Sequence, residues 1–198
     1  MNETLVFNTE ENSLQKQTKV FALVPEDDPI LLEVLPNFDF NNPPVNPTEF
    51  ASTLIDTCIL NKGYGLSANQ CGFRHRVFVM GTGNEYVAFF NPRIIESSTE
   101  TMYMSEMCLS FPMLELKISR PSGIVVEYQD FNGEIRKANF VGLSARCFQH
   151  ELDHMNGIVY TDNVKPVAYK MGMKKRQKVK NLVKKLKKAD KVMSTITE

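Results

Sequence analysis

The stretch FQHELDH, residues 148–154, is the part of the sequence from which the fold and the chemistry are best inferred. It places His150 and His154 four residues apart, which puts both side chains on one face of an α-helix. Two imidazoles in that arrangement can hold a single metal ion, and Glu151 can reach a water molecule on that ion. The motif is short enough to arise by chance, so two surface histidines that bind nothing are the alternative. The rest of the sequence decides between them.

The composition indicates one domain with a hydrophobic core. The chain has 198 residues, of which 42% are hydrophobic and 10% are aromatic, which is enough for such a core. No apolar run approaches the roughly 20 residues of a membrane span. Residues 1–19 contain three glutamates and lack both the apolar core of a secretory signal and the acid-poor composition of a transit peptide.

Cysteine usage points to a reducing compartment. The four cysteines, Cys58, Cys71, Cys108 and Cys147, include no Cys-x-x-Cys pair. In a chain of this length we expect them to be reduced thiols or metal ligands rather than a disulfide framework. The predicted location is therefore cytoplasmic.

The formal net charge of zero hides an uneven distribution. Residues 165–198 hold 12 Lys and Arg against 2 acidic residues, a net charge of +10, so residues 1–164 carry −10. We divide the chain into an N-terminal extension (1–28), a catalytic metallohydrolase domain (29–164) and a basic amphipathic C-terminal helix (165–198).

The strongest helical pattern in the tail covers residues 174–191, with one apolar stripe and lysines elsewhere. The stripe consists of Val179, Leu182, Val183, Leu186 and Ala189. Two interpretations stay open: a helix docked on the body with solvated lysines, or a basic surface that also meets RNA or a ribosome. A membrane-surface role is disfavoured because no Trp or Phe lies on the stripe.

In the part of the chain before the basic tail, a predicted helix is followed by a block of strands and then by a second helix. Asn46 and Pro47 suit the cap and first position of a helix that ends near Gly63. Strands are predicted at residues 20–24, 76–80, 85–90, 93–95, 101–104, 114–118, 124–128 and 134–138. A helix over 143–156 carries the histidines. This order predicts an α+β fold, with antiparallel β-sheets packed around a central helix that carries the HExxH motif, and with a C-terminal helix.

A catalytic metal site of this kind usually needs a third protein ligand. The remaining histidine, His75, lies just outside a glycine-rich loop and before a strand. Metalloproteases that add a third His six residues after the second would need it at position 160, which is Tyr160. Those that add a downstream Glu would have to use Glu198, in the tail. Thiolates therefore remain as candidates.

Among the four thiols, Cys108 is the best candidate. Cys147 shares the helical face of the histidines but lies about 7.5 Å along the axis from their midpoint, too far for a short side chain. Cys58 lies on an apolar helical stripe and is expected in the core, and Cys71 follows the glycine-rich stretch without a further reason. Cys108 follows a predicted strand that can run beside the helix.

Three stretches together resemble a known family. GYGLSANQ at 63–70, EMCLS at 106–110 and QHELDH at 149–154 look like the three signature motifs of peptide deformylases, in the same order. The resemblance covers roughly residues 29–160. Two positions depart from the family pattern: Met107, where most members have Gly, and Ser67, where most have Ala. Neither departure removes a chemical group, but Met107 is expected to reshape the cleft beside the metal.

The resemblance implies removal of the N-formyl group from N-formylmethionyl polypeptides, which releases formate and a free amine. Cys108, His150 and His154 would hold one divalent metal, Fe²⁺ in the cell, with Zn²⁺, Ni²⁺ or Co²⁺ as replacements. Glu151 would act as general base and then as general acid. The Gln70 amide and the Leu109 backbone N–H would meet the developing oxyanion.

The resemblance also implies a peptide-binding cleft. Gly63 and Gly65 would let the substrate backbone approach closely, with Gly65 as a strand-like pairing partner. The predicted lining of the methionine pocket is Tyr64, Met104, Leu143 and Cys147. Glu106 and Asp153 either orient a ligand imidazole or form ion pairs with, for example, Arg120 or Arg146.

Three other functions compete with this one. A metallopeptidase could use the same helix, but the third ligand expected for it is missing. A non-enzymatic binder of deformylase type would have lost a ligand or the base, and neither is lost here. A nucleic-acid module would make the basic tail the active part. The sequence does not specify the oligomeric state.

Overall fold

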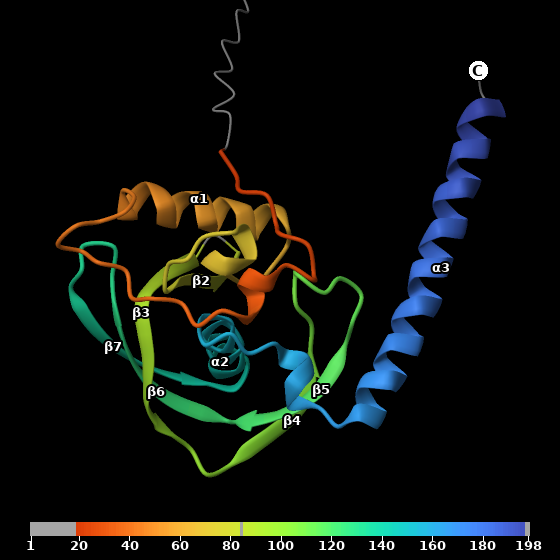
Figure 1. The fold of residues 1–198 in the computed structure, drawn as a ribbon. Coiled ribbons are helices and arrows are strands. Elements are labelled where there is room, and N and C mark those ends of the chain that lie inside the picture. The colour runs from red at the N-terminus through yellow and green to blue at the C-terminus, as the bar shows by residue number, and fades with distance from the viewer. Residues whose placement is uncertain (1–18, 84, 197–198) are drawn as a thin grey trace, which may run out of the picture.

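The strands form two separate antiparallel sheets, as the predicted α+β class requires. The computed structural model describes residues 19–83 and 85–196 (Figure 1). The larger sheet has the strand order β1-β2-β3-β6-β7, and β4 and β5 form a sheet of their own. The strands are β1 (Gly65–Ser67), β2 (Val77–Thr82), β3 (Glu85–Ser97), β4 (Thr101–Glu106), β5 (Leu116–Pro121), β6 (Gly123–Gln129) and β7 (Ile135–Val141).

The helices occupy the centre, one face and one side of the molecule. They are α1 (Pro47–Leu60), α2 (Gly142–Met155) and α3 (Pro166–Ile196), with 3-10 turns η1 (Pro29–Leu32), η2 (Ala68–Cys71) and η3 (Tyr160–Asn163). As predicted, Asn46 caps α1, and its side chain accepts hydrogen bonds from the backbone N–H groups of Thr48 and Glu49. This fixes the start of the helix that covers one end of the large sheet (Figure 1).

The central helix is α2, which carries the histidines. Its apolar side, which includes Phe148, Leu152 and Met155, packs into a core cluster with residues of the large sheet. The Phe148 ring meets those of Phe78 and Phe89 edge-on, at centroid distances of 5.0 and 5.4 Å. The apolar side therefore anchors α2, and its other side is left for the histidines.

Three local predictions need correction. Residues 20–24 form no strand; instead the Phe21 and Val24 N–H groups donate to Thr57 Oγ1 and to the Gln70 carbonyl, each at 2.9 Å. The strands predicted at 85–90 and 93–95 are one strand, β3, with register shifts opposite β6. Strand β1, with only three residues, lies in the stretch expected to be a glycine-rich loop.

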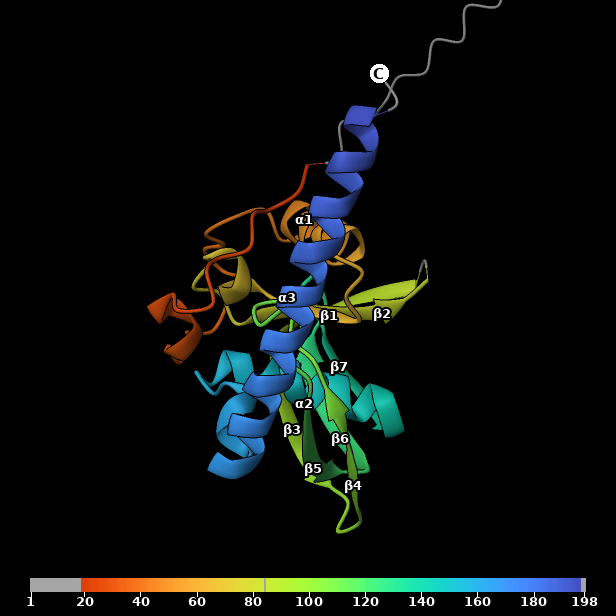
Figure 2. The same ribbon diagram turned by 90° about the vertical axis from the view of Figure 1, so that its right-hand side faces the viewer.

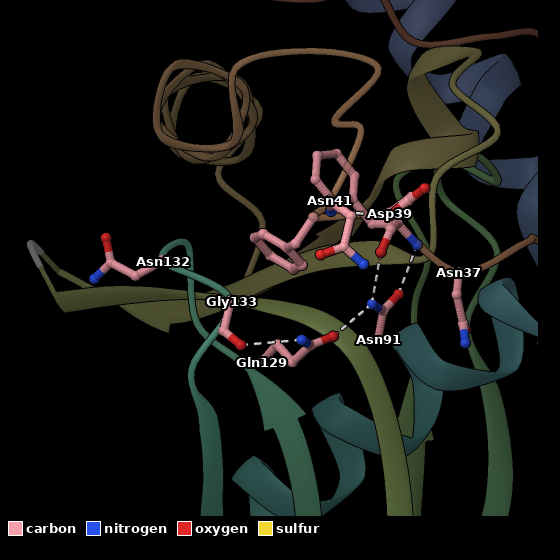
Figure 3. Close-up of a pocket in the computed structure, with 9 residues that line it drawn as sticks. Asn37, Asp39, Asn41, Asn91, Gln129, Asn132 and Gly133 are labelled. Carbon is pink, nitrogen blue, oxygen red and sulfur yellow. Dashed lines mark hydrogen bonds between the residues drawn. The ribbon is translucent and has the colours of Figure 1, made fainter.

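Asn91 ties the N-terminal segment to the large sheet. Its φ of 50° places its side chain beside Phe38, whose N–H donates to Asn91 Oδ1 at 2.7 Å. Asn91 Nδ2 donates to the Phe38 carbonyl at 2.9 Å and to Gln129 Oε1 at 2.7 Å (Figure 3). These residues line a hollow of about 610 Å³. The Asn91 and Gln129 amides bond within the protein, so these hydrogen bonds hold the N-terminal segment on the large sheet.

The C-terminal helix, predicted over 165–198 with its clearest stripe at 174–191, spans Pro166–Ile196 and docks through its first part. A Cβ at Gly172 would lie 2.6 Å from Leu116 Cδ2, so the helix backbone approaches β5 closely. Arg176, 3% exposed, donates to the Pro112 carbonyl at 2.9 Å and pairs with Glu26. Beyond it the stripe residues Leu182 and Leu186 are 56% exposed, and the helix runs past the body (Figures 1 and 2).

Of the N-terminal extension predicted at 1–28, residues 1–18 lie outside the described part of the chain. None of the described helices combines the length and apolar character that a bilayer span requires.

Candidate metal centre

Three side chains from two distant parts of the chain converge beside α2. Cys108 follows the end of β4, and His150 and His154 lie on the helix. One ligand atom from each, all three residues being buried, lies within 4.8 Å of the others. Cys108 Sγ is 3.3 Å from His154 Nε2. The structure thus brings together the three side chains predicted as ligands and leaves Cys58 and Cys71 in the core.

Gln70 reaches this group from η2. Its Nε2 is 3.4 Å from Cys108 Sγ and 3.0 Å from Ser110 Oγ. Its Oε1 accepts hydrogen bonds from the Ser67 N–H at 2.9 Å and from the Ser67 hydroxyl at 3.1 Å. The carbonyl end is therefore held by β1, and the amide N–H₂ end faces the sulfur. The serine at position 67 adds a hydrogen bond to this arrangement.

Glu106 connects His150 to two arginines. Its Oε2 lies 3.1 Å from His150 Nδ1, and its carboxylate accepts from Arg120 at 2.6 and 2.9 Å and from Arg146 at 2.5 Å. Both alternatives predicted for Glu106 therefore occur together. Asp153 forms the predicted ion pair only: its carboxylate accepts a hydrogen bond from Arg120 Nη1 at 2.8 Å.

Glu151 is buried against Gly65, on β1. A Cβ at position 65 would lie 2.4 Å from Glu151 Oε1, so only glycine leaves room for this carboxylate. Within the described part of the chain, Glu151 Oε2 and His154 Nδ1 are buried without a hydrogen-bond partner. Buried polar atoms are rarely left unpaired, so a water molecule or an ion is the expected partner of such atoms.

The donor set fits a divalent metal. Typical metal–sulfur and metal–nitrogen bonds are about 2.3 and 2.1 Å, so a sulfur and a nitrogen 3.3 Å apart can both bind one ion. A thiolate with two imidazoles is a common ligand set for ions such as zinc and iron. The residues present therefore form a candidate metal site.

The charges of the site favour the ligand form of the thiol. Burial opposes ionisation of Cys108, but the neighbouring His154 and His150 bring its pKa well below the usual value. Burial likewise opposes protonation of His150, yet its bonds to Cys108 and Glu106 raise its pKa to about 10. For Glu106, burial is outweighed by His150 and Arg120, and its pKa falls to about 2. Since the ligands must be deprotonated, metal binding would release protons here.

The pKa of Glu151 shifts in the opposite direction to that of Glu106. Burial raises its pKa to about 7, although the two imidazoles pull it down. A carboxyl group that titrates near neutral pH can both accept and donate a proton under ordinary conditions. This is the property that a general base and acid needs.

The residues predicted to bind substrate differ in exposure. Tyr64 and Leu143 are 73% and 68% exposed, and Met104 and Cys147 are partly buried. Burial and the nearby Glu151 raise the pKa of the Cys147 thiol well above its usual value, whereas the pKa of Cys108 is lowered. Met107 is 70% exposed.

A Cβ at Gly63 would lie 2.8 Å from Leu109 Cδ1, which joins the glycine-rich stretch to the Cys108 turn. The two signature stretches therefore meet through a contact that only glycine permits at position 63.

Two supporting residues were not predicted. Tyr86 donates from its hydroxyl to the Gly63 carbonyl at 2.7 Å, and Asn69 donates to the His154 carbonyl at 2.9 Å. Arg146, which the sequence analysis named as an example of an ion-pair partner, donates to Glu106 at 2.5 Å. For Tyr86 the partner is remote in sequence, and no local pattern indicates it.

Comparison with known proteins agrees with the geometry. The family model for polypeptide deformylase matches residues 20–170. The chain belongs to the peptide deformylase family. The deformylase of Thermotoga neapolitana is 43% identical over 123 residues, 62% of this chain and 74% of that protein. The deformylase of Wolbachia pipientis wMel is 38% identical over 147 residues, 67% of this chain and 81% of its own.

Solved deformylases have the same fold. The crystal structure from Thermotoga maritima superposes with a TM-score of 0.67 at 37% identity, over 74% of this chain and 99% of that one. A Met-Ala-Ser-bound structure from Acinetobacter baumannii gives 0.70 at 26% identity, over 74% and 99%. Like other peptide deformylases, this protein is a metal-dependent hydrolase that removes the N-formyl group of nascent polypeptides and releases formate.

The contact between Gly65 and Glu151 gives a direct test of the site. We expect Gly65→Ala to displace the carboxylate and lower kcat/KM for a formyl-Met peptide by about 10-fold or more, because small misplacements in an active site are costly. Formate release measures this. In Gly123→Ala the new Cβ would meet its nearest atom at 3.7 Å, so this control should keep full activity. Full activity in Gly65→Ala would contradict the packing described.

Proposed function

We propose that Cys108, His150 and His154 hold one divalent metal ion, Fe²⁺ in the cell, with Zn²⁺, Ni²⁺ or Co²⁺ able to replace it. The observation that carries this is the convergence of the three buried ligand atoms within 4.8 Å. When bound, such an ion supplies Lewis-acid chemistry, polarising the formyl carbonyl and lowering the pKa of water.

In this proposal Glu151 moves the proton. Its carboxylate takes a proton from the attacking water and then delivers it to the departing amide nitrogen. The attack forms a bond to the formyl carbon, and loss of the amine gives formate. The pKa of about 7 supports this double role.

We assign the stabilisation of the oxyanion to Gln70 and Leu109. The Gln70 N–H₂ group is already turned toward the site by the hydrogen bonds at its carbonyl end, so no reorganisation is needed during the reaction. The Leu109 backbone N–H follows Cys108 directly in the chain. Donors of this kind typically contribute about 3 kcal/mol each.

We place the peptide substrate along β1. This strand is the edge of the large sheet, so its outer side can pair with an extended peptide. Gly63 and Gly65 keep the approach free of side chains, and the exposed Tyr64 lies between them. Met104, Leu143 and Cys147 complete the pocket for methionine in this proposal. The Met-Ala-Ser peptide bound to the Acinetobacter baumannii relative supports such a substrate.

The three competing functions have less support. Membership of the deformylase family argues against a peptidase and against a binder without activity. We take residues 29–164 as the catalytic unit, flanked by the N-terminal extension (1–28) and the C-terminal helix (165–198). We also place the enzyme in the cytoplasm, where nascent polypeptides are available and its four cysteines can remain free thiols.

A contact with the ribosome is a second proposal. Beyond Arg176 the exposed part of α3 carries lysines at positions 178, 180, 184, 185, 187 and 188. A basic helix that runs past the body can bind the phosphate backbone of RNA by charge. This would hold the enzyme near its substrates.

Replacement of the base tests the mechanism. We expect Glu151→Gln to lower kcat for a formyl-Met peptide by about 100-fold or more while the metal content stays unchanged, because the amide cannot accept the proton. Glu134→Gln, at a 62% exposed side chain, is the control and should be fully active. Substantial formate release by Glu151→Gln would rule out the role of this residue.

Two cysteine variants test the ligand assignment. Cys108→Ala should lose its metal during purification without oxygen, whereas Cys147→Ala should keep about one ion per chain. Metal analysis after gel filtration gives the result. The reverse pattern would show that Cys147 is the sulfur ligand.

Truncation after Gln177 tests the ribosome contact. It keeps Gly172 and Arg176, which dock the helix, and removes its exposed part. We expect unchanged formate release from short peptides and loss of salt-sensitive co-sedimentation with ribosomes. A full-length variant with glutamine at positions 184, 185, 187 and 188 separates charge from length. If both variants co-sediment with ribosomes as well as the wild type does, the proposed contact through α3 is wrong.

A further inference from the structure

Arg146 is a buried charged residue that the proposed reaction does not use. It is 5% exposed and lies on α2 four residues before His150, one turn away on the same face. Burying a guanidinium is costly unless it is paired and hydrogen-bonded. Its partners therefore indicate what the residue does.

Within the part of the chain that the structure describes, the hydrogen-bond partners of Arg146 belong to the small sheet. Nη1 donates to Glu106 Oε1 at 2.5 Å and to the Ile118 carbonyl at 3.0 Å. Nη2 donates to the Met102 carbonyl. Met102 and Glu106 lie on β4 and Ile118 lies on β5. One side chain of the central helix thus binds both strands of that sheet.

The small sheet determines where the sulfur lies. Strand β4 ends at Glu106, two residues before Cys108, and pairs only with β5 among the described strands. The position of Cys108 relative to the histidines therefore depends on the contacts between this sheet and α2. A second such contact, from Arg120 to Asp153, spans 2.8 Å. Residues 146 and 153 are about 10 Å apart along the helix, so the two contacts flank His150.

We propose that Arg146 is a positioning residue of the metal centre, which holds the β4–β5 sheet and Glu106 against α2 so that the Cys108 sulfur meets the two imidazoles. The inference rests on the proposed metal site. It assigns to Arg146 a role in the geometry of the ligands rather than only in the stability of the fold.

Loss of the guanidinium would affect both the Glu106 carboxylate and the strand carbonyls that Arg146 binds. Glu106 would keep Arg120 but lose one cation, and the Met102 and Ile118 carbonyls would each lose a donor. Leaving buried acceptors unpaired weakens the contact between the sheet and the helix. Changes in residues that orient metal ligands typically reduce metal affinity by 10–100-fold, as a rough range.

The test uses the cobalt-substituted full-length enzyme, because the visible spectrum of Co²⁺ reports thiolate and imidazole coordination independently of activity. Arg146→Met keeps the length of the side chain and removes its charge and its donors. We expect an altered cobalt spectrum, about 10-fold easier removal of cobalt by a competing chelator, and a fall in kcat larger than the rise in KM. Arg93→Met, which breaks an exposed pair with Glu127, is the control and should match the wild type.

Thermal unfolding of the metal-free proteins separates the proposed role from stability alone. A folded Arg146→Met with the wild-type spectrum and chelator resistance would overturn the proposal, whatever its Tm. If Arg146→Met does not fold, the cobalt measurements on Arg146→Lys test the proposal instead. One ammonium cannot serve the carboxylate and both strand carbonyls, so we expect about threefold easier cobalt removal, and wild-type retention would overturn the proposal. A wild-type enzyme without a thiolate–cobalt spectrum would refute the metal site itself.

Discussion

The buried carboxylate of Glu106 is the constraint on which the site depends. It accepts hydrogen bonds from Arg120 and Arg146 and lies beside His150. A buried charge of this kind is tolerated only when it is fully paired, and here two cations and an imidazole provide the pairing. Because the partners come from β5 and from two turns of α2, satisfying one carboxylate fixes the distance between the small sheet and the helix.

The large sheet determines the remaining geometry. Aromatic contacts of Phe148 hold α2 on this sheet, and β1 brings Gly65 against Glu151. The short turn after β1 then presents Gln70, whose carbonyl end is bound by Ser67. Each group of the site is thus placed by a contact with a rigid element, which is the condition for preorganised catalysis.

The sequence predicted those parts of the site that depend on local spacing. His150, Glu151 and His154 follow from one helical turn, and Cys108 was selected because the other ligand types were missing. Strand β1 was not predicted, because three residues carry too little periodicity to distinguish a strand from a loop. The bulged course of β3 depends on a partner strand remote in sequence, which one chain alone does not reveal. Arg146 was named only as an example of an ion-pair partner, because the sequence does not show that its side chain reaches both strands of the small sheet. The apolar stripe at 174–191 indicated α3, but it did not indicate that the helix docks through the turns before and at the start of that stripe, near Gly172 and Arg176.

Because α3 docks only near its start, most of its length extends away from the body as a single helix. It is held near Gly172 and Arg176, and from there to Ile196 an α-helix extends about 30 Å. A rigid helix of that length would keep a partner bound at its C-terminal end at a fixed distance from the cleft. Capture at the tip would then raise the effective concentration of substrates emerging at that distance and would do little for those released elsewhere. The enzyme would thus select its substrates by where they emerge as well as by their chemistry.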